Sequence, residues 1–72
     1  MTRGRRSLIA VLQRTTGREV AARVGVAKQT VSDWVRGINK PRRDARLALQ
    51  RLYGISPAAW DARIEPPALN KL

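Results

Sequence analysis

The sequence has no cysteine, no histidine and only three aromatic residues among its 72 positions. Without cysteine the chain forms no disulfide, and without cysteine or histidine it lacks the usual ligands of a structural zinc ion. A chain of this length buries only about 60% of the surface that its unfolded form exposes. Stability must therefore come from packing of apolar helices or from oligomerisation, and we expect no metal, no cofactor and no small-molecule substrate.

Long apolar runs and closely paired carboxylates are absent as well. The apolar stretches are short and interrupted by arginine, so the sequence predicts neither a membrane-spanning helix nor an export signal. We therefore expect a cytoplasmic protein without a membrane partner. The lack of histidine, cysteine and paired carboxylates also argues against catalysis, so we predict that the protein is not an enzyme.

Negatively charged residues are scarce, and the excess of positively charged residues lies in the N-terminal part of the chain. The chain has 15 Lys and Arg against 5 Asp and Glu, a net charge of +10. Residues 1–43 hold eleven basic and two acidic residues, whereas residues 44–72 are close to neutral. An arginine-rich genome would not concentrate the excess in this way. The distribution predicts a polyanionic partner that binds the N-terminal part of the chain.

Helical periodicity runs through most of the sequence, and no stretch alternates with the period of a strand. Residues 1–6 are basic without periodicity and are expected to form a flexible arm. The domain should span residues 7–63, followed by an irregular tail over 64–72. We predict an all-α, compact bundle of four to five helices, with helices over about 7–14, 17–24, 28–36 and 45–53 and a short fifth helix after Ser56-Pro57.

Residues 17–37 form the most informative segment. Thr16 and Glu19 have the spacing of a capping box, and Gly25 is suited to end a helix in the left-handed conformation. Two short helices joined by a tight turn need a small residue at their contact, a glycine in the turn and apolar residues that fix their angle. The sequence meets these needs with Ala21, Gly25, Val20, Val26, Val31 and Trp34.

The helix over 28–36 has two distinct faces. At 100° per residue, Lys28, Gln29, Ser32, Asp33 and Arg36 share one side, while the apolar residues occupy the other. A cation, an amide, a hydroxyl and a carboxylate are the groups that read base edges in the major groove. An ordinary solvated helix face would have the same composition, but the turn motif and the charge distribution favour nucleic-acid binding.

These features resemble the lambda repressor and Cro family of phage-type helix-turn-helix proteins. The resemblance covers about residues 7–63 and rests on Ala21, Gly25-Val26, Val31-Ser32, Trp34, Gly37-Ile38-Asn39, Pro41, Tyr53-Gly54-Ile55-Ser56-Pro57 and Trp60. It implies a five-helix domain whose third helix enters the major groove of double-stranded DNA. It also implies a sequence-specific transcriptional regulator, a repressor of phage type, in a bacterial or phage-infected cell and associated with its nucleoid.

The same resemblance assigns roles to individual positions. The base-facing positions that it implies are Ala27, Lys28, Gln29, Ser32 and Asp33. Backbone contacts are expected from Arg18, Thr30, Arg36, Asn39, Lys40, Arg42 and Arg43. Members of the family usually bind palindromic DNA as homodimers, and the apolar residues available for a dimer contact are chiefly Ile55, Ile64, Leu69 and Leu72.

Two positions depart from the family pattern. The family often has Gln at the start of the second helix, where it touches a phosphate, and this chain has Gly17. We expect Arg18 to replace that contact. The family commonly caps the third helix with Ser or Thr, and this chain has Ala27, which should weaken the helix start by about 1 kcal/mol.

Three groups of residues have alternative interpretations. Asp33 either accepts from a cytosine or adenine amino group or pairs with Arg36. The aromatic residues either stack on unpaired bases or pack in the core, and helical spacing favours packing for Trp34 and Tyr53. The third group is the possible arm contacts Arg3, Arg5 and Arg6. These arginines either contact DNA, in the minor groove or at phosphates, or form a solvated tail.

Two other functions fit a helix-turn-helix chain. One is DNA packaging of the small-terminase type, which usually needs a long oligomerisation segment that residues 64–72 are too short to supply. The other is a protein-binding module, such as a toxin–antitoxin component. The net charge of residues 1–43 argues against the loss of DNA binding.

Overall fold

The computed structural model describes residues 1–63, which form four α-helices and one short 3-10 helix. The elements are α1 (Arg3–Val11), α2 (Gly17–Val24), α3 (Lys28–Arg36), α4 (Arg43–Tyr53) and the 3-10 helix η1 (Pro57–Trp60). The prediction of an all-α fold is confirmed. No helix in this range has the length and apolar character needed to cross a membrane. The predicted irregular tail over 64–72 lies outside the described residues.

The bounds of α2 and α3 agree with those predicted from the sequence. Thr16 accepts a hydrogen bond from the Glu19 backbone N–H at 3.1 Å and so caps α2. The Glu19 carboxylate accepts a hydrogen bond from Arg23 and does not complete the predicted capping box. Both helices end at a glycine in the left-handed conformation, Gly25 with φ 87° and Gly37 with φ 78°. Local signals therefore suffice to delimit these two helices.

The prediction that residues 1–6 form a flexible arm is wrong for residues 3–6, which are the first turn of α1. Thr2 caps this helix by accepting from the Arg5 backbone N–H at 3.1 Å. The Arg3 backbone N–H donates to the Ala62 carbonyl at 2.8 Å. Gly4 is buried so closely against the Trp60 ring that an added Cβ would overlap the ring. These contacts with the far end of the domain order a segment whose local sequence is uninformative.

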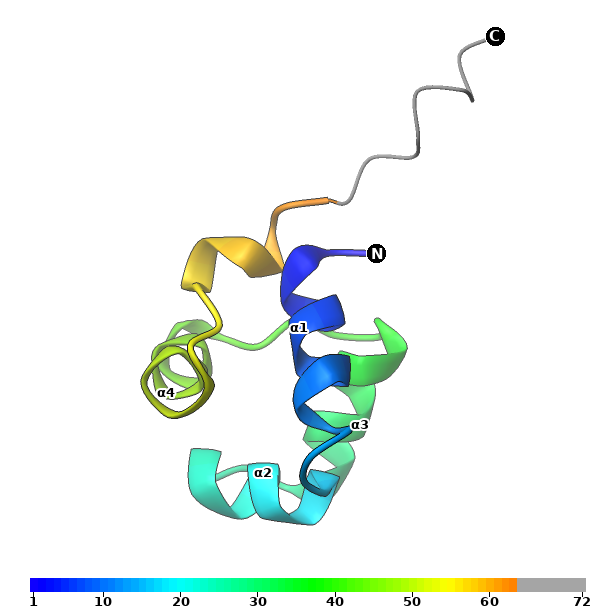
Figure 1. Cartoon of the computed structure of the whole chain (residues 1–72), viewed down its shortest axis with the longest axis vertical. Coiled ribbons are helices and arrows are strands. Elements are labelled where there is room, and N and C mark those ends of the chain that lie inside the picture. The colour runs from blue at the N-terminus through cyan, green and yellow to red at the C-terminus, as the bar shows by residue number, and fades with distance from the viewer. Residues whose placement is uncertain (64–72) are drawn as a thin grey trace, which may run out of the picture.

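The helices surround α1, which runs through the middle of the molecule (Figure 1). α3 lies along one side of α1, α4 lies on the other side, and α2 crosses below and contacts both α3 and α4. η1 packs against the N-terminal half of α1 and against α4. This arrangement leaves one face of α3 free of contact with the other helices.

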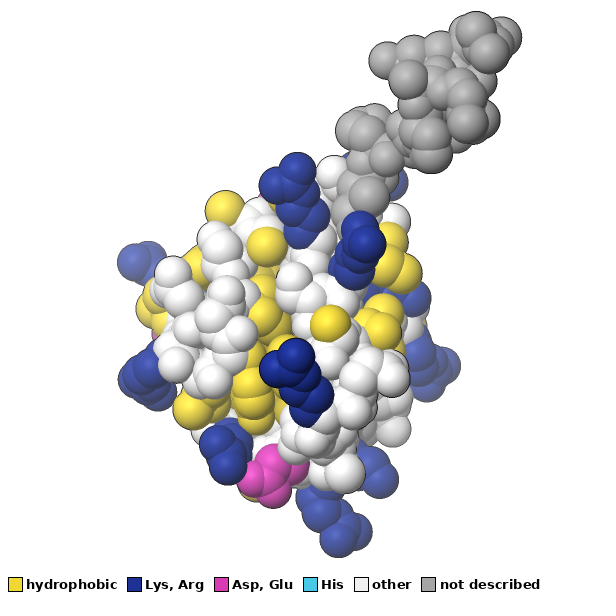
Figure 2. Space-filling view, in the orientation of Figure 1, with side chains coloured by type: hydrophobic (Ala, Val, Ile, Leu, Met, Phe, Trp, Pro, Cys, Tyr) yellow, Lys and Arg dark blue, Asp and Glu magenta, His cyan; other side chains and the backbone are white. Residues whose placement is uncertain are grey.

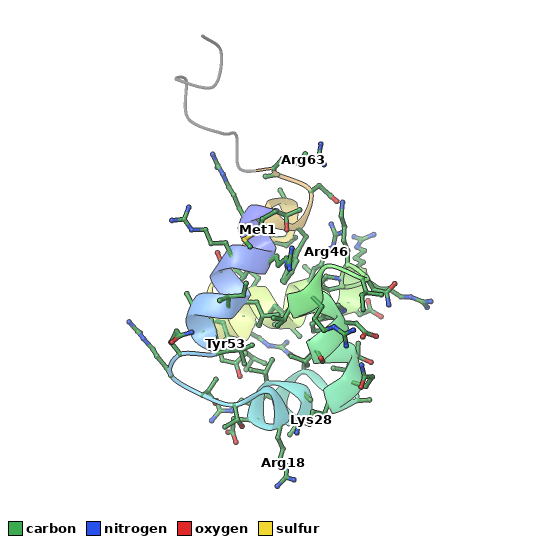
Figure 3. The ribbon with its side chains drawn as sticks, turned by 90° about the vertical axis from the view of Figure 1, so that its right-hand side faces the viewer. Met1, Arg18, Lys28, Arg46, Tyr53 and Arg63 are labelled. Atoms are coloured by element: carbon green, nitrogen blue, oxygen red, sulfur yellow. The ribbon has the colours of Figure 1, made fainter. Side chains whose placement is uncertain are left out.

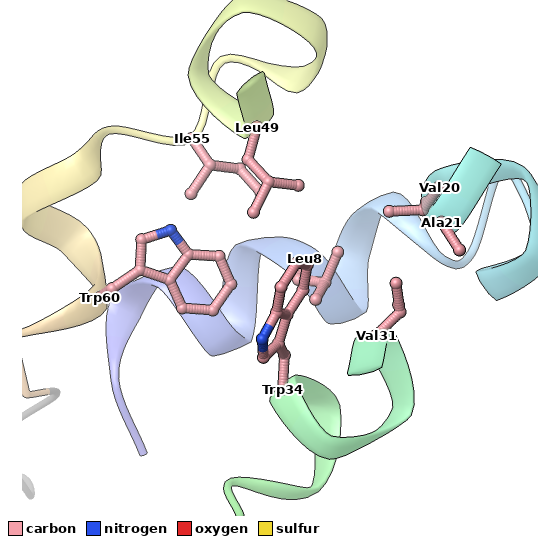
Figure 4. Close-up of a cluster of buried hydrophobic side chains, with 8 residues drawn as sticks. All are labelled: Leu8, Val20, Ala21, Val31, Trp34, Leu49, Ile55 and Trp60. Atoms are coloured by element: carbon pink, nitrogen blue, oxygen red, sulfur yellow. The ribbon is translucent and has the colours of Figure 1, made fainter. Parts of the chain in front are cut away.

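Every element contributes to one hydrophobic core (Figure 4). Its fully or nearly fully buried members are Leu8, Val20, Ala21, Val31, Trp34, Leu49, Ile55 and Trp60. The Trp34 and Trp60 rings meet with centroids 6.4 Å apart and planes inclined by 57°. The two tryptophans therefore pack in the core, as predicted for Trp34, and do not offer a surface on which bases could stack.

Ile55 corrects a second expectation. Its side chain is only 3% exposed and packs beside Leu49, so it is unavailable for the dimer contact assigned to it from the sequence. The other apolar residues expected at that contact, Ile64, Leu69 and Leu72, lie outside the described residues. Gly54, in the left-handed conformation, ends α4 and turns the chain so that Ile55 points inward.

Candidate nucleic-acid interface

The turn between α2 and α3 fixes the position of α3. Three residues, Gly25 to Ala27, connect the helices, and the Gly25 and Val26 N–H groups both donate to the Ala21 carbonyl, at 2.8 and 3.0 Å. Val20 and Val31 are buried between the two helices. Because both valines are buried in this contact, α3 cannot rotate without exposing apolar surface. Its outer face therefore keeps a constant orientation.

The outer face of α3 has the composition predicted from the sequence. Lys28, Gln29 and Arg36 are exposed, and Ser32 and Asp33 are partly exposed. Ala27, the residue before the helix, is exposed and offers no side-chain hydrogen bond to the first turn, as expected. Hydrogen-bonding groups of several kinds are thus presented together on one rigid surface.

Gln29 and Asp33 are joined by a hydrogen bond that sequence reasoning missed. The Gln29 Nε2 group donates to Asp33 Oδ1 at 3.0 Å, one helical turn away. Within the described residues, Asp33 forms no ion pair with Arg36, so the alternative based on that pair is wrong for this structure. The sequence signal that could have predicted this hydrogen bond is an amide at position i followed by a carboxylate at position i+4 of a helix.

Basic residues lie at both ends of this face. Arg18, in the first turn of α2, and Lys28 project at the end of the molecule away from Met1 and Arg63 (Figure 3). On the other side, the connector between α3 and α4 exposes Asn39, Lys40 and Arg42, and the first residue of α4, Arg43, is exposed as well. Thr30, partly exposed, lines a groove of about 620 Å³ together with Lys40 and Arg42.

Arg46 holds the connector in place. Its Nε donates to the Pro41 carbonyl at 2.8 Å, and its Nη1 donates to Asp61 Oδ2 at 2.9 Å. Pro41 itself is buried. The cationic loop is therefore anchored from α4 and from the residue after η1, although no local pattern in the sequence points to pairs 5 and 15 residues apart in the chain.

Lys40, expected to contact DNA backbone, is paired within the protein. Its Nζ lies 3.2 Å from Asp61 Oδ1, and both side chains are more than half exposed. The hydrogen bond from Arg46, and after it the one from Lys40, holds the pKa of the Asp61 carboxyl below its ordinary value. An exposed pair of this kind is weak, so a phosphate can replace Asp61 as the partner of Lys40.

The three arginines of the predicted arm differ in their surroundings. Arg3 and Arg6 are exposed on α1, whereas Arg5 is half-buried and its Nε donates to the Val35 carbonyl in the last turn of α3. The Arg5 guanidinium also lies over Gly37. The expectation that Arg5 lies in a flexible arm is therefore wrong: Arg5 is part of α1 and binds the C-terminal end of α3, where a cation is favourable.

Comparison with known proteins identifies the arrangement. Residues 9–60, more than half of the chain, match a family model described as helix-turn-helix. The chain belongs to the helix-turn-helix family. The match is to the Cro and C1 type of this family, which confirms the resemblance seen in the sequence, and proteins of this type are DNA-binding regulators that are not typically enzymes. No curated protein and no solved structure matches the chain.

The surface of this helix-turn-helix protein is basic around its edge. On the face shown in Figure 2, Lys and Arg side chains surround a hydrophobic area between α1 and α4. Among residues 1–63, two acidic residues form ion pairs, Glu19 with Arg23 and Asp61 with Lys40 and Arg46, and a third, Asp33, accepts a hydrogen bond from Gln29. Most of the positive charge is thus left to act on a partner.

Proposed function

We propose that the protein binds double-stranded DNA sequence-specifically by placing the outer face of α3 in the major groove, and that it regulates transcription as a repressor of phage type in the cytoplasm of its cell. The observation that carries this proposal is the face itself. Lys28, Gln29, Ser32 and Asp33 are accessible on a helix whose inner side, with Val31 and Trp34, is locked in the core.

Base recognition would centre on the first turns of α3. Lys28 can donate to O6 and N7 of guanine, and Gln29 can form two hydrogen bonds with adenine. Ser32 lies one turn after Lys28 and Asp33 one turn after Gln29, so these partly exposed side chains reach neighbouring base pairs. Ala27, exposed just ahead of the helix, suits contact with a thymine methyl group.

Phosphate contacts would flank this face on two sides. Arg18 supplies a cation beside the N-terminus of α2, where Gly17 offers no side chain of its own. Such contacts position the protein without reading sequence. The remaining residues proposed for the backbone are Thr30, Arg36, Asn39, Lys40, Arg42 and Arg43, with Arg3 and Arg6 as further exposed cations on α1.

A single recognition helix reads only a few base pairs, so we propose that two copies bind a palindromic site. Their α3 helices would then lie roughly 34 Å apart, one turn of duplex. The contact between copies does not involve the buried Ile55. Light scattering on the complex with a selected site would show two chains per duplex, and one chain per duplex at all concentrations contradicts the dimer.

Selection of bound fragments from a random pool of duplex DNA tests the proposal directly. A regulator enriches one sequence, and a palindrome among the products supports a dimeric repressor. Tight binding without enrichment favours a packaging role instead. An absence of binding at low salt favours a protein-binding module, because the exposed cations would then serve no nucleic acid.

A further inference from the structure

The hydrogen bond between Gln29 and Asp33 lies on the face proposed to read DNA. It joins Gln29 Nε2 to Asp33 Oδ1 at 3.0 Å, and the inference drawn from it rests on the proposed function. Gln29 is exposed, Asp33 is partly exposed, and the hydrogen bond between them lies at the surface. Because an aspartate side chain has one torsion fewer than a glutamine side chain, the carboxylate is the more fixed partner, and the amide is oriented by it.

This contact limits what the glutamine can present. A free glutamine amide carries one acceptor oxygen and two N–H donors, and it turns easily about its last torsion. When one N–H is held by Asp33, the nitrogen must lie on the C-terminal side of the amide. The exposed edge then consists of the Oε1 acceptor and the one remaining N–H donor, in a constant order.

We infer that Asp33 is a positioning residue that restricts Gln29 to adenine. In the major groove adenine offers an N6 donor and an N7 acceptor, which match the edge that Gln29 is left with. Guanine offers two acceptors, O6 and N7, at the same places. Guanine at this position would bring its O6 against Gln29 Oε1, and the amide cannot turn to avoid this without breaking its bond to Asp33.

The same carboxylate accounts for the presence of an acid on a basic face. A negative charge beside DNA phosphates weakens binding to every sequence, so Asp33 has a cost in affinity. The carboxylate increases selectivity in exchange, because the preference for one base depends on rejecting another. Removing the carboxylate should therefore strengthen binding to random DNA while it weakens discrimination.

The test compares two substitutions of Asp33 with the wild-type protein, on a site recovered by selection and on the same site with guanine in place of the adenine that faces Gln29. The wild-type protein should prefer adenine by about tenfold, the effect of one good bidentate contact. Asp33→Ala should reduce this preference to within about threefold. Asp33→Asn should weaken it as well, because the Asn amide can donate to Gln29 Oε1 as readily as its oxygen accepts the Gln29 N–H, so Gln29 is no longer held in one orientation. Both substitutions should raise affinity for random DNA.

Asp44→Asn is the matched control. Asp44 is an exposed acid in the first turn of α4, beside the cationic connector, and its substitution removes the same charge. We expect it to raise affinity for random DNA without altering the preference for adenine. In a Gln29→Ala background, Asp33→Ala should have no further effect on base preference. A further measurement needs no DNA: the side-chain amide protons of Gln29 in the free protein should exchange faster with water in Asp33→Ala than in the wild-type protein.

The outcomes separate this inference from the proposed function. If the wild-type protein enriches no sequence, both fail, and the amide-exchange result still shows whether Asp33 holds Gln29. If the wild-type protein selects adenine and Asp33→Ala keeps the full preference, the function stands and the positioning role is overturned. If Asp44→Asn lowers the preference as Asp33→Ala does, loss of charge and not of positioning is responsible, and the inference is overturned as well.

Discussion

At the scale of single residues, arginines of the same chain have opposite uses. Arg5 and Arg46 are partly buried and donate to backbone carbonyls of Val35 and Pro41, so they hold segments of the fold together. Arg36 is exposed and has no ion-pair partner within residues 1–63. A guanidinium has five donors and serves either purpose, and the tertiary surroundings decide which.

Substitutions on α3 and in the connector should separate base reading from backbone contact. Lys28→Ala or Gln29→Ala should cost about 1–3 kcal/mol of binding free energy on the preferred site and little on random DNA. Arg36→Ala and Arg43→Ala should instead weaken binding to all sequences alike and lower the salt slope by about one unit each. Titration of each variant with specific and random duplexes measures both effects.

Folding controls accompany these variants. All four side chains are exposed, so circular dichroism should show native stability for each. Trp34→Ala, by contrast, should lower the free energy of unfolding by about 3–5 kcal/mol, because it empties a core position. A folded Lys28→Ala or Gln29→Ala protein with unchanged site preference would mean that α3 is not the reader.

Arg5→Ala should destabilise the fold. The substitution removes the hydrogen bond to the Val35 carbonyl and the cation at the C-terminus of α3, an expected loss of about 1–2 kcal/mol in the free energy of unfolding. Arg6→Ala, which removes an exposed arginine from the same helix turn, should leave stability within about 0.5 kcal/mol. Denaturant unfolding compares the two. Equal stability together with a reduced salt slope for Arg5→Ala would restore its role as a DNA contact.

Asp61 should make stability depend on pH in the acid range. Because Arg46 and Lys40 lower the pKa of its carboxyl in the folded protein, the ionised form stabilises the fold above the ordinary pKa of 3.8. That contribution is lost as the pH falls through the lowered pKa. Asp61→Asn should therefore be less stable than wild type at pH 6, and the difference should shrink below pH 4. Asp44→Asn, which breaks no ion pair of the described residues, is the control for the loss of one negative charge at pH 6.

At the scale of elements, α1 and α2 begin in the same way but depend on different contacts. Each has a threonine cap that accepts a backbone N–H at 3.1 Å, Thr2 for α1 and Thr16 for α2. The glycines that follow differ. Gly4 is pressed against Trp60, while an added Cβ at Gly17 would meet only a Val31 methyl group at 4.0 Å, an ordinary contact distance.

The same substitution at these two glycines should have opposite effects. Gly17→Ala should raise the free energy of unfolding by up to about 0.5–1 kcal/mol, because it restricts the unfolded chain and meets no obstacle in the helix. Gly4→Ala should lower it by about 1–3 kcal/mol, since the methyl group would displace α1 from the Trp60 ring. Thermal unfolding of the two variants beside wild type measures both changes. A stabilised Gly4→Ala protein would show that the first turn of α1 does not depend on this packing.

At the scale of the whole molecule, charge should govern how tightly DNA is held. Residues 1–43 contain eleven of the fifteen basic residues, and they include α2, α3 and the connector. If about six phosphates are neutralised, the slope of log K against log salt should be near −5. Equilibrium titration between about 50 and 200 mM salt gives the slope. A nearly flat dependence contradicts DNA binding by this face.

The sequence alone determined the parts of the protein that rest on local rules. Thr16, Gly25 and Gly37 delimit α2 and α3, because caps and left-handed glycines act on their own neighbours. The 3.6-residue period separated the core side of α3 from its outer face, so Val31, Trp34, Lys28 and Gln29 were assigned to the correct sides.

The tertiary structure alone decided what residues distant in sequence do to one another. The ordered start of α1 depends on Trp60 closing over Gly4, some 56 residues away, and no local pattern encodes that contact. For the same reason, the sequence did not predict that Arg5 binds the end of α3 or that Ile55 lies in the core and not at the surface. Caps and periodicity act within a few residues, whereas burial is shared among all the helices that meet at the core.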